Sequence, residues 1–284
     1  MKYEFVKEHQ AEFTVKLLCD VLGISRSGYY DWLTHTPSKR DLSNQVLDAK
    51  IQEVYDANKK RYGAPRITKA LKCAGISCSH TRVARRLKHL NLAAVAGKKY
   101  RVTTDSNHNN PIFDNVLKRD FIARGINEKW VGDITYIPTK EGWLYLAVVI
   151  DIYSRGVIGW AMSKRMNKQL VCDALTMALF KRKFPKGVIM HTDRGSQYCS
   201  NKYRSIIKNN KMIGSMSRVG NCWDNAIAES FFHSLKVELI KQERYISRQQ
   251  ARQSIFQYIE GYYNAKRIHS SIDYMPPNVF EYAC

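Results

Sequence analysis

Three consecutive stretches decide the fold: WVGDITYIP (130–138), WLYLAVVID (143–151) and GVIGWAM (156–162). All three are rich in β-branched and aromatic residues, and turn-like segments separate them. Short apolar runs of this composition between turn signals are typical of β-strands. We therefore predict three short strands that form an antiparallel meander.

Helical and strand patterns then alternate towards the C-terminus. We expect helices over 168–184, 200–210 and 225–239, and strands over 188–193 and 212–216. The resulting order, β-β-β-α-β-α-β-α, is that of an α/β ribonuclease-H-like domain. A further helix is expected to continue to about residue 263.

Three carboxylates occupy separate elements of this predicted domain. Asp133 lies inside the first strand, Asp193 follows the fourth, and Glu229 lies on the last helix. Carboxylate oxygens are preferred ligands of hard cations such as Mg2+, and two such ions about 4 Å apart can promote an in-line phosphoryl displacement. The three acids are therefore candidate catalytic and metal-binding residues. Asp133 is the candidate to bridge two Mg2+ ions, which Mn2+ is expected to replace.

Each of these acids also has a structural alternative. Asp133 could pair with a lysine, Asp193 could form a turn with Gly195, and Glu229 could be an exposed helix residue. An aspartate inside an apolar strand is nevertheless disfavoured by propensity and by burial. The joint spacing of the three acids therefore favours function over the three structural alternatives together.

Two further acids are interpreted as structural, and one lysine as functional. Asp151 could cap a turn or form an ion pair with Arg155, and Asp224 is expected to N-cap the helix of Glu229. Lys236 follows Glu229 by seven residues, and 3.6 residues per turn place both on one helix face. It is a candidate to bind a DNA phosphate, the alternative being a solvent-facing lysine.

The composition favours a polyanionic partner. Among 284 residues, 46 Lys and Arg against 25 Asp and Glu give a net charge of +21. This charge predicts phosphate contacts, with nucleic acid as the leading candidate partner. The seven cysteines are scattered and odd in number, and no signal peptide is recognised, so reduced thiols in a cytoplasm are expected. The longest apolar run is too short to cross a membrane.

Two helix-turn-helix patterns precede the predicted catalytic domain. In residues 11–34 and again in 67–92, two helical patterns flank a Gly-Ile-Ser turn. On its own, the first could equally be a helical hairpin that packs on its neighbours. The second lies in a stretch between Asp56 and Asp105 that holds thirteen Lys and Arg and no acid. Solvated helix faces usually mix charge signs, so this stretch favours DNA binding. The DNA contacts predicted within it are Arg66, Arg82, Arg85, Arg86 and Lys88.

These patterns predict five parts of the chain. The run VTTDSNHNNP (102–111) is polar and lacks helical or strand periodicity, which is typical of a linker. The parts are a helical region (1–40), a basic helix-turn-helix region (41–101), a linker (102–123), the ribonuclease-H-like core (124–240) and a helical C-terminal extension (241–284).

Five blocks of the sequence carry a resemblance to a known family. They are WVGDITYI, LYLAVVIDIYSRGVIGW, HTDRGSQY, MSRVGNCWDNAIAESFFHSLK and YIEGYYNAKRIHSSI. In this order they resemble the OrfB-type transposases of the bacterial insertion-sequence three family, whose catalytic domain is similar to retroviral integrase. By that resemblance Asp133, Asp193 and Glu229 match the DDE triad, and Lys236 matches the basic residue after its glutamate.

The resemblance also implies an activity and partners. It implies Mg2+-dependent cleavage at the ends of an insertion sequence and joining of a 3′ hydroxyl to DNA. Such proteins are commonly made as fusions behind an OrfA part, which is expected to be separate from this chain. Because two DNA ends must be held, we expect a homo-oligomer on the terminal repeats and on target DNA, both double-stranded. The resemblance also implies a bacterial cytoplasm and association with the nucleoid. A nuclease without joining activity and a DNA-binding regulator with an inactive core are the alternatives.

We predict that neutralising Arg82, Arg85 and Arg86 weakens DNA binding and flattens its salt dependence. Each lost phosphate contact removes released counterions, so the slope of log K against log salt concentration falls by about 0.9 per contact. Anisotropy titrations with duplex DNA at several salt concentrations measure this slope. An unchanged slope would place the DNA elsewhere on the protein.

Overall fold

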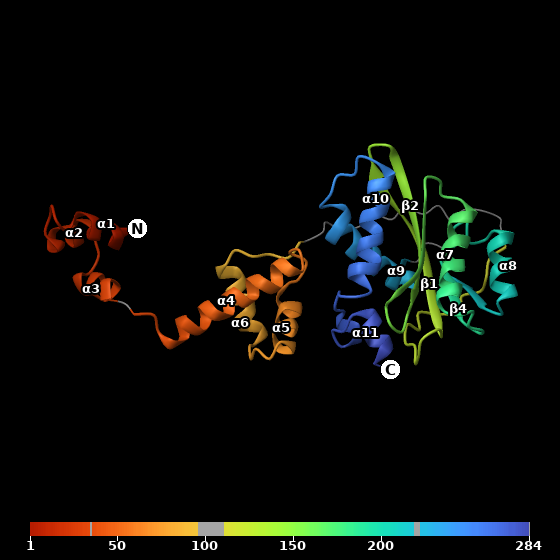
Figure 1. The fold of residues 1–284 in the computed structure, drawn as a ribbon, viewed down its shortest axis with the longest axis horizontal. Helices are drawn as coiled ribbons and strands as arrows, with labels where there is room; N and C mark the ends of the chain where they lie inside the picture. The colour runs from red at the N-terminus through yellow and green to blue at the C-terminus, as the bar shows by residue number, and fades with distance from the viewer. Residues whose placement is uncertain (35, 96–110, 219–221, 284) are drawn as a thin grey trace.

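The computed structural model describes residues 1–34, 36–95, 111–218 and 222–283. In Figure 1 the helices of the N-terminal part extend to one side of a domain built around a sheet. The helices before the sheet are α1 (Lys2–His9), α2 (Val15–Leu22), α3 (Arg26–Thr34), α4 (Lys39–Ala57), α5 (Ala64–Cys73) and α6 (His80–His89).

The sheet contains an antiparallel half and a parallel half. Its strands are β1 (Lys129–Thr139), β2 (Gly142–Asp151), β3 (Val157–Ser163), β4 (Ile189–Thr192) and β5 (Ile213–Met216), in the order β3-β2-β1-β4-β5. Antiparallel pairs join β1 to β2 and β2 to β3, so the predicted meander is confirmed. Parallel pairs join β1 to β4 and β4 to β5.

Helices cover both faces of this sheet (Figure 1). On one face α7 (Lys168–Lys181) and α8 (Asn201–Asn209) pack on apolar side chains such as Trp130 and Val149. On the other face lie α9 (Ala226–Leu235), the π-helical turn η2 (Lys236–Ile240), α10 (Arg248–Phe256) and the π-helical η3 (Gln257–Tyr263). The remaining elements are the 3-10 turns η1 (Cys222–Asn225) and η4 (Ser270–Ile272) and the short helix α11 (Pro277–Tyr282). The predicted ribonuclease-H-like fold class is therefore confirmed.

One predicted helix end differs from the structure. Helix α7 ends at Lys181 and not at residue 184, because Lys183 and Phe184 adopt left-handed backbone angles with φ of 56°. Residues 111–123 of the predicted linker pack on the sheet domain, since Leu117 is buried in its core. Residues 102–110 of that linker lie outside the described residues. The helices α10 and η3 of the predicted C-terminal extension belong to the same core as the sheet.

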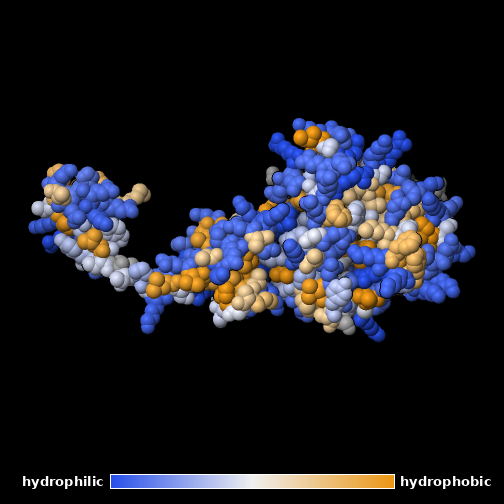
Figure 2. Space-filling view, viewed as in Figure 1, coloured by the Kyte–Doolittle hydropathy of each residue, from blue (hydrophilic) through white to orange (hydrophobic). Residues whose placement is uncertain are grey.

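The helices before the sheet form two small cores of their own. Helices α1 to α3 bury only Val6, Leu18, Cys19 and Tyr29, whereas α4 to α6 bury a larger set around Ile51. Figure 2 shows apolar groups scattered among polar ones over this part of the molecule. A core this small buries little surface, so α1 to α3 contribute little stability by themselves. No helix in the described part of the chain is long and apolar enough to span a membrane.

We predict that Gly159→Ala destabilises the sheet domain. A Cβ at this position of β3 would lie 2.3 Å from the carbonyl oxygen of Ala174 and 2.7 Å from the Cβ of Ala178, so α7 would have to move. Overpacking of this kind costs about 1–3 kcal/mol, which a thermal melt detects. Gly125→Ala is the matched control, since no atom lies within 4 Å of its Cβ position. Equal melting temperatures for the two variants would contradict the close approach of β3 and α7.

Candidate active site

The pairing of β1 with β4 brings two of the predicted acids together. Gly132 pairs in parallel register with Thr192, and the next residues along the two strands are Asp133 and Asp193. The β1–β4 ladder stops at this pair, so Asp133 in the interior of β1 and Asp193 just after β4 lie next to each other where β4 ends. Ligands of α/β proteins commonly bind at the carboxyl ends of parallel strands, and both side chains are partly buried here.

Local hydrogen bonds orient the two aspartates. Asp133 Oδ1 accepts the backbone N–H of Ile134 at 2.8 Å. Asp193 Oδ1 accepts the N–H of Gly195 at 3.0 Å, so the predicted turn with this glycine is present. Since one oxygen of a carboxylate can make such a turn while the other stays available, the turn does not decide against a metal-binding role.

Helix α9 brings Glu229 to the same place. Its side chains Phe231, Phe232 and Leu235 are buried against the sheet. At its start, Asn225 Nδ2 donates to the carbonyl oxygen of Gly132 at 3.2 Å, which ties the helix to the residue before Asp133. Glu229 itself is partly buried, so the alternative of a fully exposed helix residue is wrong. Sequence reasoning missed Asn225, because its partner is a backbone atom that lies far away in the chain.

Charge interactions connect all four predicted residues. Burial raises the pKa of Asp133 well above its usual range, the negative charges of Asp193 and Glu229 raise this pKa further, and Lys236 opposes the rise. Burial likewise raises the pKa of Glu229. The site therefore holds more negative charge than its surroundings stabilise, and a cation would relieve this repulsion.

Lys236 lies at the end of α9, beside the acidic group. Its Nζ is 5.0 Å from the centroid of the Tyr136 ring, a cation–π contact with the strand that carries Asp133. Burial lowers the pKa of Lys236, and the charge of Asp133 counteracts this. The lysine is partly buried, so the alternative of a fully solvent-facing lysine is wrong. Tyr136 was not singled out from the sequence, because its contact depends on where α9 ends.

The donor set fits a hard divalent cation. All three acids offer carboxylate oxygens, which such ions prefer. Within the described residues, no three His, Cys, Asp or Glu side chains are grouped around a single position for an ion. An arrangement in which Asp133 is shared and each other acid serves one ion needs only two protein carboxylates per ion, with DNA and water as the remaining ligands.

A neutral histidine supports the strand that leads to Asp193. His191 is fully buried, and its two ring nitrogens lie 2.8 Å from Ser215 Oγ and 3.1 Å from Ser217 Oγ. Burial lowers the pKa of His191 to about 4, although Asp224 opposes the shift. Near the acids Tyr198 is also buried, and its hydroxyl has no hydrogen-bond partner.

The two rival acids are structural, but not entirely in the ways expected. Asp151 caps a turn as predicted, accepting N–H groups of Asn127 and Tyr153. Its ion-pair partner is Arg182 at 3.8 Å, so the predicted pair with Arg155 is wrong.

Asp224 does not N-cap α9, because the N-cap residue is Asn225. The side chain of Asn225 makes no capping hydrogen bond to α9. The fully buried carboxylate of Asp224 instead pairs with Arg119 at 2.7 Å and Arg218 at 3.2 Å. These contacts hold the pKa of Asp224 well below its usual range, although burial opposes them. Long-range ion pairs of this kind leave no local signal in a sequence.

The basic residues predicted to bind DNA fall into two groups. On α6, Arg85 and Lys88 are exposed. Arg82 donates to Asn44 and Ser43, and Arg86 donates to both oxygens of Asp48, so these two hold α6 against α4. Arg66 on α5 lies 3.8 Å from Glu238 and is partly buried. Lys98, Lys99 and Arg101 of the basic stretch lie outside the described residues.

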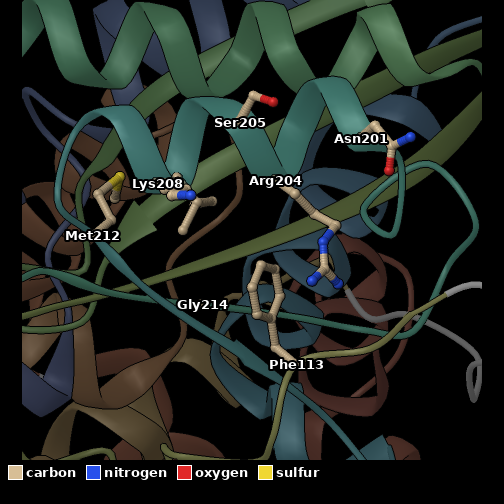
Figure 3. Close-up of a pocket in the computed structure, with 8 residues that line it drawn as sticks. Phe113, Asn201, Arg204, Ser205, Lys208, Met212 and Gly214 are labelled. Atoms are coloured by element: carbon tan, nitrogen blue, oxygen red, sulfur yellow. The ribbon is translucent and has the colours of Figure 1, made fainter.

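A cavity of about 450 Å³ lies beside α8, and its lining contains none of the predicted catalytic residues (Figure 3). Phe113 and Arg204 form part of its wall, with the Arg204 guanidinium 4.7 Å from the ring centroid. Arg204 also donates to the carbonyl oxygen of Pro111 at 3.0 Å. The cavity is thus a feature separate from the acidic group.

Comparison with known proteins identifies the family. Residues 123–222 and 211–277 match two families that are each described as an integrase core domain, and residues 41–100 match an HTH-like domain. The transposase InsF for insertion sequence IS3A of Escherichia coli (strain K12) is 49% identical over 283 residues, which cover 99% of this chain and 98% of that protein. The chain belongs to the IS3 family of insertion-sequence transposases.

Other similar proteins include one relative and two solved structures. The Insertion element IS600 uncharacterized 31 kDa protein of Shigella sonnei is 43% identical over 93% of this chain and 97% of its own. The simian T-cell lymphotropic virus intasome in complex with PP2A regulatory subunit B56 gamma has a TM-score of 0.47 at 14% identity, over 81% of this chain and 74% of that chain. The HTLV-2 integrase catalytic core domain in complex with magnesium, in its trimeric form, has a TM-score of 0.44 at 15% identity, over 56% of this chain and 99% of that chain.

We predict that this transposase loses stability in acid partly through His191. Its folded pKa of about 4 lies below the ordinary histidine pKa of 6.5, so protons bind the unfolded state first as the pH falls. The resulting contribution to the free energy of unfolding is fully present above pH 6.5 and is lost between pH 6.5 and 4. It amounts to up to about 3 kcal/mol.

His191→Asn should therefore flatten the pH dependence of the unfolding free energy in this window. Denaturant titrations at several pH values measure it for both proteins, and the difference between them cancels the contributions of other groups. A difference that does not change between pH 6.5 and 4 would show that His191 is not buried in its neutral form.

Proposed function

We propose that the protein cuts DNA at the ends of an insertion sequence and joins the resulting 3′ hydroxyl to target DNA. The observation that carries this proposal is the convergence of three acids and a lysine beside the end of β4, in a chain of the IS3 transposase family. Cleavage and joining are both in-line displacements at phosphorus, so one acidic site can serve both.

In this proposal the protein chiefly positions charges. Asp133, held by a strand interior, would be a ligand common to two divalent ions, and Asp193 and Glu229 would each be a ligand to one of them. When bound, two Mg2+ ions, or Mn2+ in their place, activate the attacking oxygen and stabilise the leaving oxygen. The raised pKa of Asp133 supports this assignment, because ion binding removes the repulsion among the carboxylates.

Lys236 holds a phosphate beside the acids. It is partly buried, and a charge contact in such surroundings is stronger than one in water. The Tyr136 ring under its ammonium group limits where the side chain can point. Lys236 therefore fixes the DNA backbone relative to Asp133 without becoming a metal ligand.

The helical part before the sheet provides DNA binding in this proposal. The exposed Arg85 and Lys88 of α6 are the strongest candidates for phosphate contacts, and the net charge of +21 supports them. We extend the proposal to a homo-oligomer that holds two terminal repeats, to an OrfA product or an OrfA–OrfB fusion as partner, and to the bacterial nucleoid as the place of action. The division into parts at residues 40, 101, 123 and 240 stays a prediction.

We predict that Asp133→Asn abolishes strand transfer while the protein keeps its fold and its DNA affinity. Loss of a central catalytic carboxylate lowers the rate by roughly 10^3-fold or more. Labelled DNA that carries the insertion-sequence ends, incubated with Mg2+ and both forms of the protein, with and without the OrfA-fused form, reports the joined product. Circular dichroism and DNA titrations check the fold and the binding. Asp173→Asn, an exposed position on α7, is the control with the same change of charge.

Three outcomes would contradict the proposal. Strand transfer that is unchanged in Asp133→Asn would remove this residue from the active site. Hydrolysis of RNA in a hybrid without any joined DNA would indicate a nuclease. Repression of a promoter without metal and without nicking would indicate a DNA-binding regulator.

A further inference from the structure

A buried carboxylate lies on the same helical stretch as the catalytic residues. Glu238 follows Glu229 by nine residues and Lys236 by two, within the π-helical turn η2. Only 8% of its surface is exposed. Arg267 donates to it through Nε, 3.0 Å from each oxygen, and through Nη2 at 2.7 Å, and Tyr258 Oη donates at 2.9 Å. Glu238 thus has its partners within the catalytic domain.

The helix-turn-helix part reaches the same carboxylate from the other side. Arg61 Nε donates to the backbone oxygen of Glu238 at 3.1 Å. Arg66 Nη1 lies 3.8 Å from Glu238 Oε1. Burial lowers the pKa of Arg66, and the nearby Arg267 lowers it further. Two arginines from the DNA-binding part therefore converge on one residue beside the active site.

Aromatic and backbone contacts add to the contacts of the two arginines with Glu238, and together we call these contacts the joint. The guanidinium of Arg61 lies 4.3 Å from the ring centroid of Tyr262. Tyr262 packs against the hydrophobic core of the sheet domain and also against that of α4 to α6. Tyr62 Oη donates to the oxygen of Lys266 at 3.3 Å and accepts the N–H of Ile268 at 3.2 Å. The two cores are thus continuous at this point.

The joint lies on the same helical turn as one of the proposed catalytic-site residues. Lys236 is the first residue of η2 and Glu238 is the third, so both belong to one turn. Turns of π-helix within helices are frequent at functional sites. A displacement of Glu238 would therefore be passed to Lys236, and through α9 to Glu229.

We propose that Arg61 and Arg66 are positioning residues that lock the helix-turn-helix part onto Glu238 and thereby set the placement of Lys236 and Glu229. Arg66 then acts through Glu238, whereas the sequence suggested a phosphate contact. The inference rests on the proposed function, because it assigns these arginines to strand transfer. It goes beyond that function by coupling the DNA-binding part to the geometry of the active site.

The test compares two pairs of substitutions with the same loss of charge. The joint variant, Arg61→Gln with Arg66→Gln, removes the contacts of both arginines with Glu238 and leaves the contacts of Glu238 with Arg267 and Tyr258 intact. The control pair is Lys69→Gln with Lys72→Gln, on α5, the helix that carries Arg66. It removes two charges that have no part in the joint. Both are assayed in the full chain with Mg2+ and labelled insertion-sequence ends, as single-turnover strand transfer at saturating DNA.

We expect the joint variant to lose about 10- to 100-fold in the saturated rate, as misplacement by a distant change can cause. The control pair should keep the rate at saturation, and both pairs should lose similar DNA affinity. A joint variant that loses affinity beyond the control but keeps its saturated rate would overturn the inference, because Arg66 would then act as a DNA contact.

Hydrogen exchange provides a readout that does not depend on activity. Peptides around residues 61–66 and 258–269 should exchange faster in the joint variant than in the control pair, because the contacts between them are lost. Unchanged exchange, or faster exchange with a normal saturated rate, would overturn the inference. If the wild-type chain and its OrfA-fused form both show no strand transfer, the proposed function fails, while exchange still reports whether the joint exists.

A second pair of variants distinguishes the proposed coupling from a general loss of folding. Tyr262→Phe keeps the ring under Arg61 and removes only a buried hydroxyl that has no partner, so its rate should equal that of the wild type. Tyr262→Ala removes the ring and should reproduce the slow rate and the fast exchange of the joint variant. Equal rates for the two variants would contradict the proposed coupling.

Discussion

The parallel pairing of β1 with β4 is the constraint on which the site depends. With Gly132 opposite Thr192, the next residues, Asp133 and Asp193, lie next to each other where β4 ends. Two carboxylates so placed repel each other, and the raised pKa of Asp133 records that repulsion together with the cost of burial. Hydrophobic packing on both faces of the sheet maintains this arrangement. The stability of the core thus holds together a site that is electrostatically unfavourable until a cation binds.

Helix α9 connects this site to the rest of the chain. Its start is tied to β1 through Asn225, its apolar side packs on the sheet, and its end continues into the turn that holds Lys236 and Glu238. One helical stretch therefore carries the proposed catalytic acid Glu229, the proposed phosphate-binding Lys236, and Glu238, which contacts the helix-turn-helix part.

Much of the fold could be predicted from the sequence, because local patterns specify it. The apolar runs of β1 to β3 and the helical periodicity of α7 to α10 gave the correct order of elements and the correct fold class. The errors concern contacts over long distances in the chain. Asp224 pairs with Arg119, and Arg86 with Asp48, and no pattern near either residue indicates these partners.

The sequence by itself determined the class of the domain and the membership of the IS3 family, and it singled out the three acids and the lysine as candidates. These follow from residue types and spacings, which a chain retains in any conformation. Only the tertiary structure decided which basic side chains face solvent, which carboxylates are buried, and that Arg61 and Arg66 meet beside Glu238. The physical reason is that burial and ion pairing depend on distances in space, and residues 177 positions apart, such as Arg61 and Glu238, become neighbours only when the chain is folded.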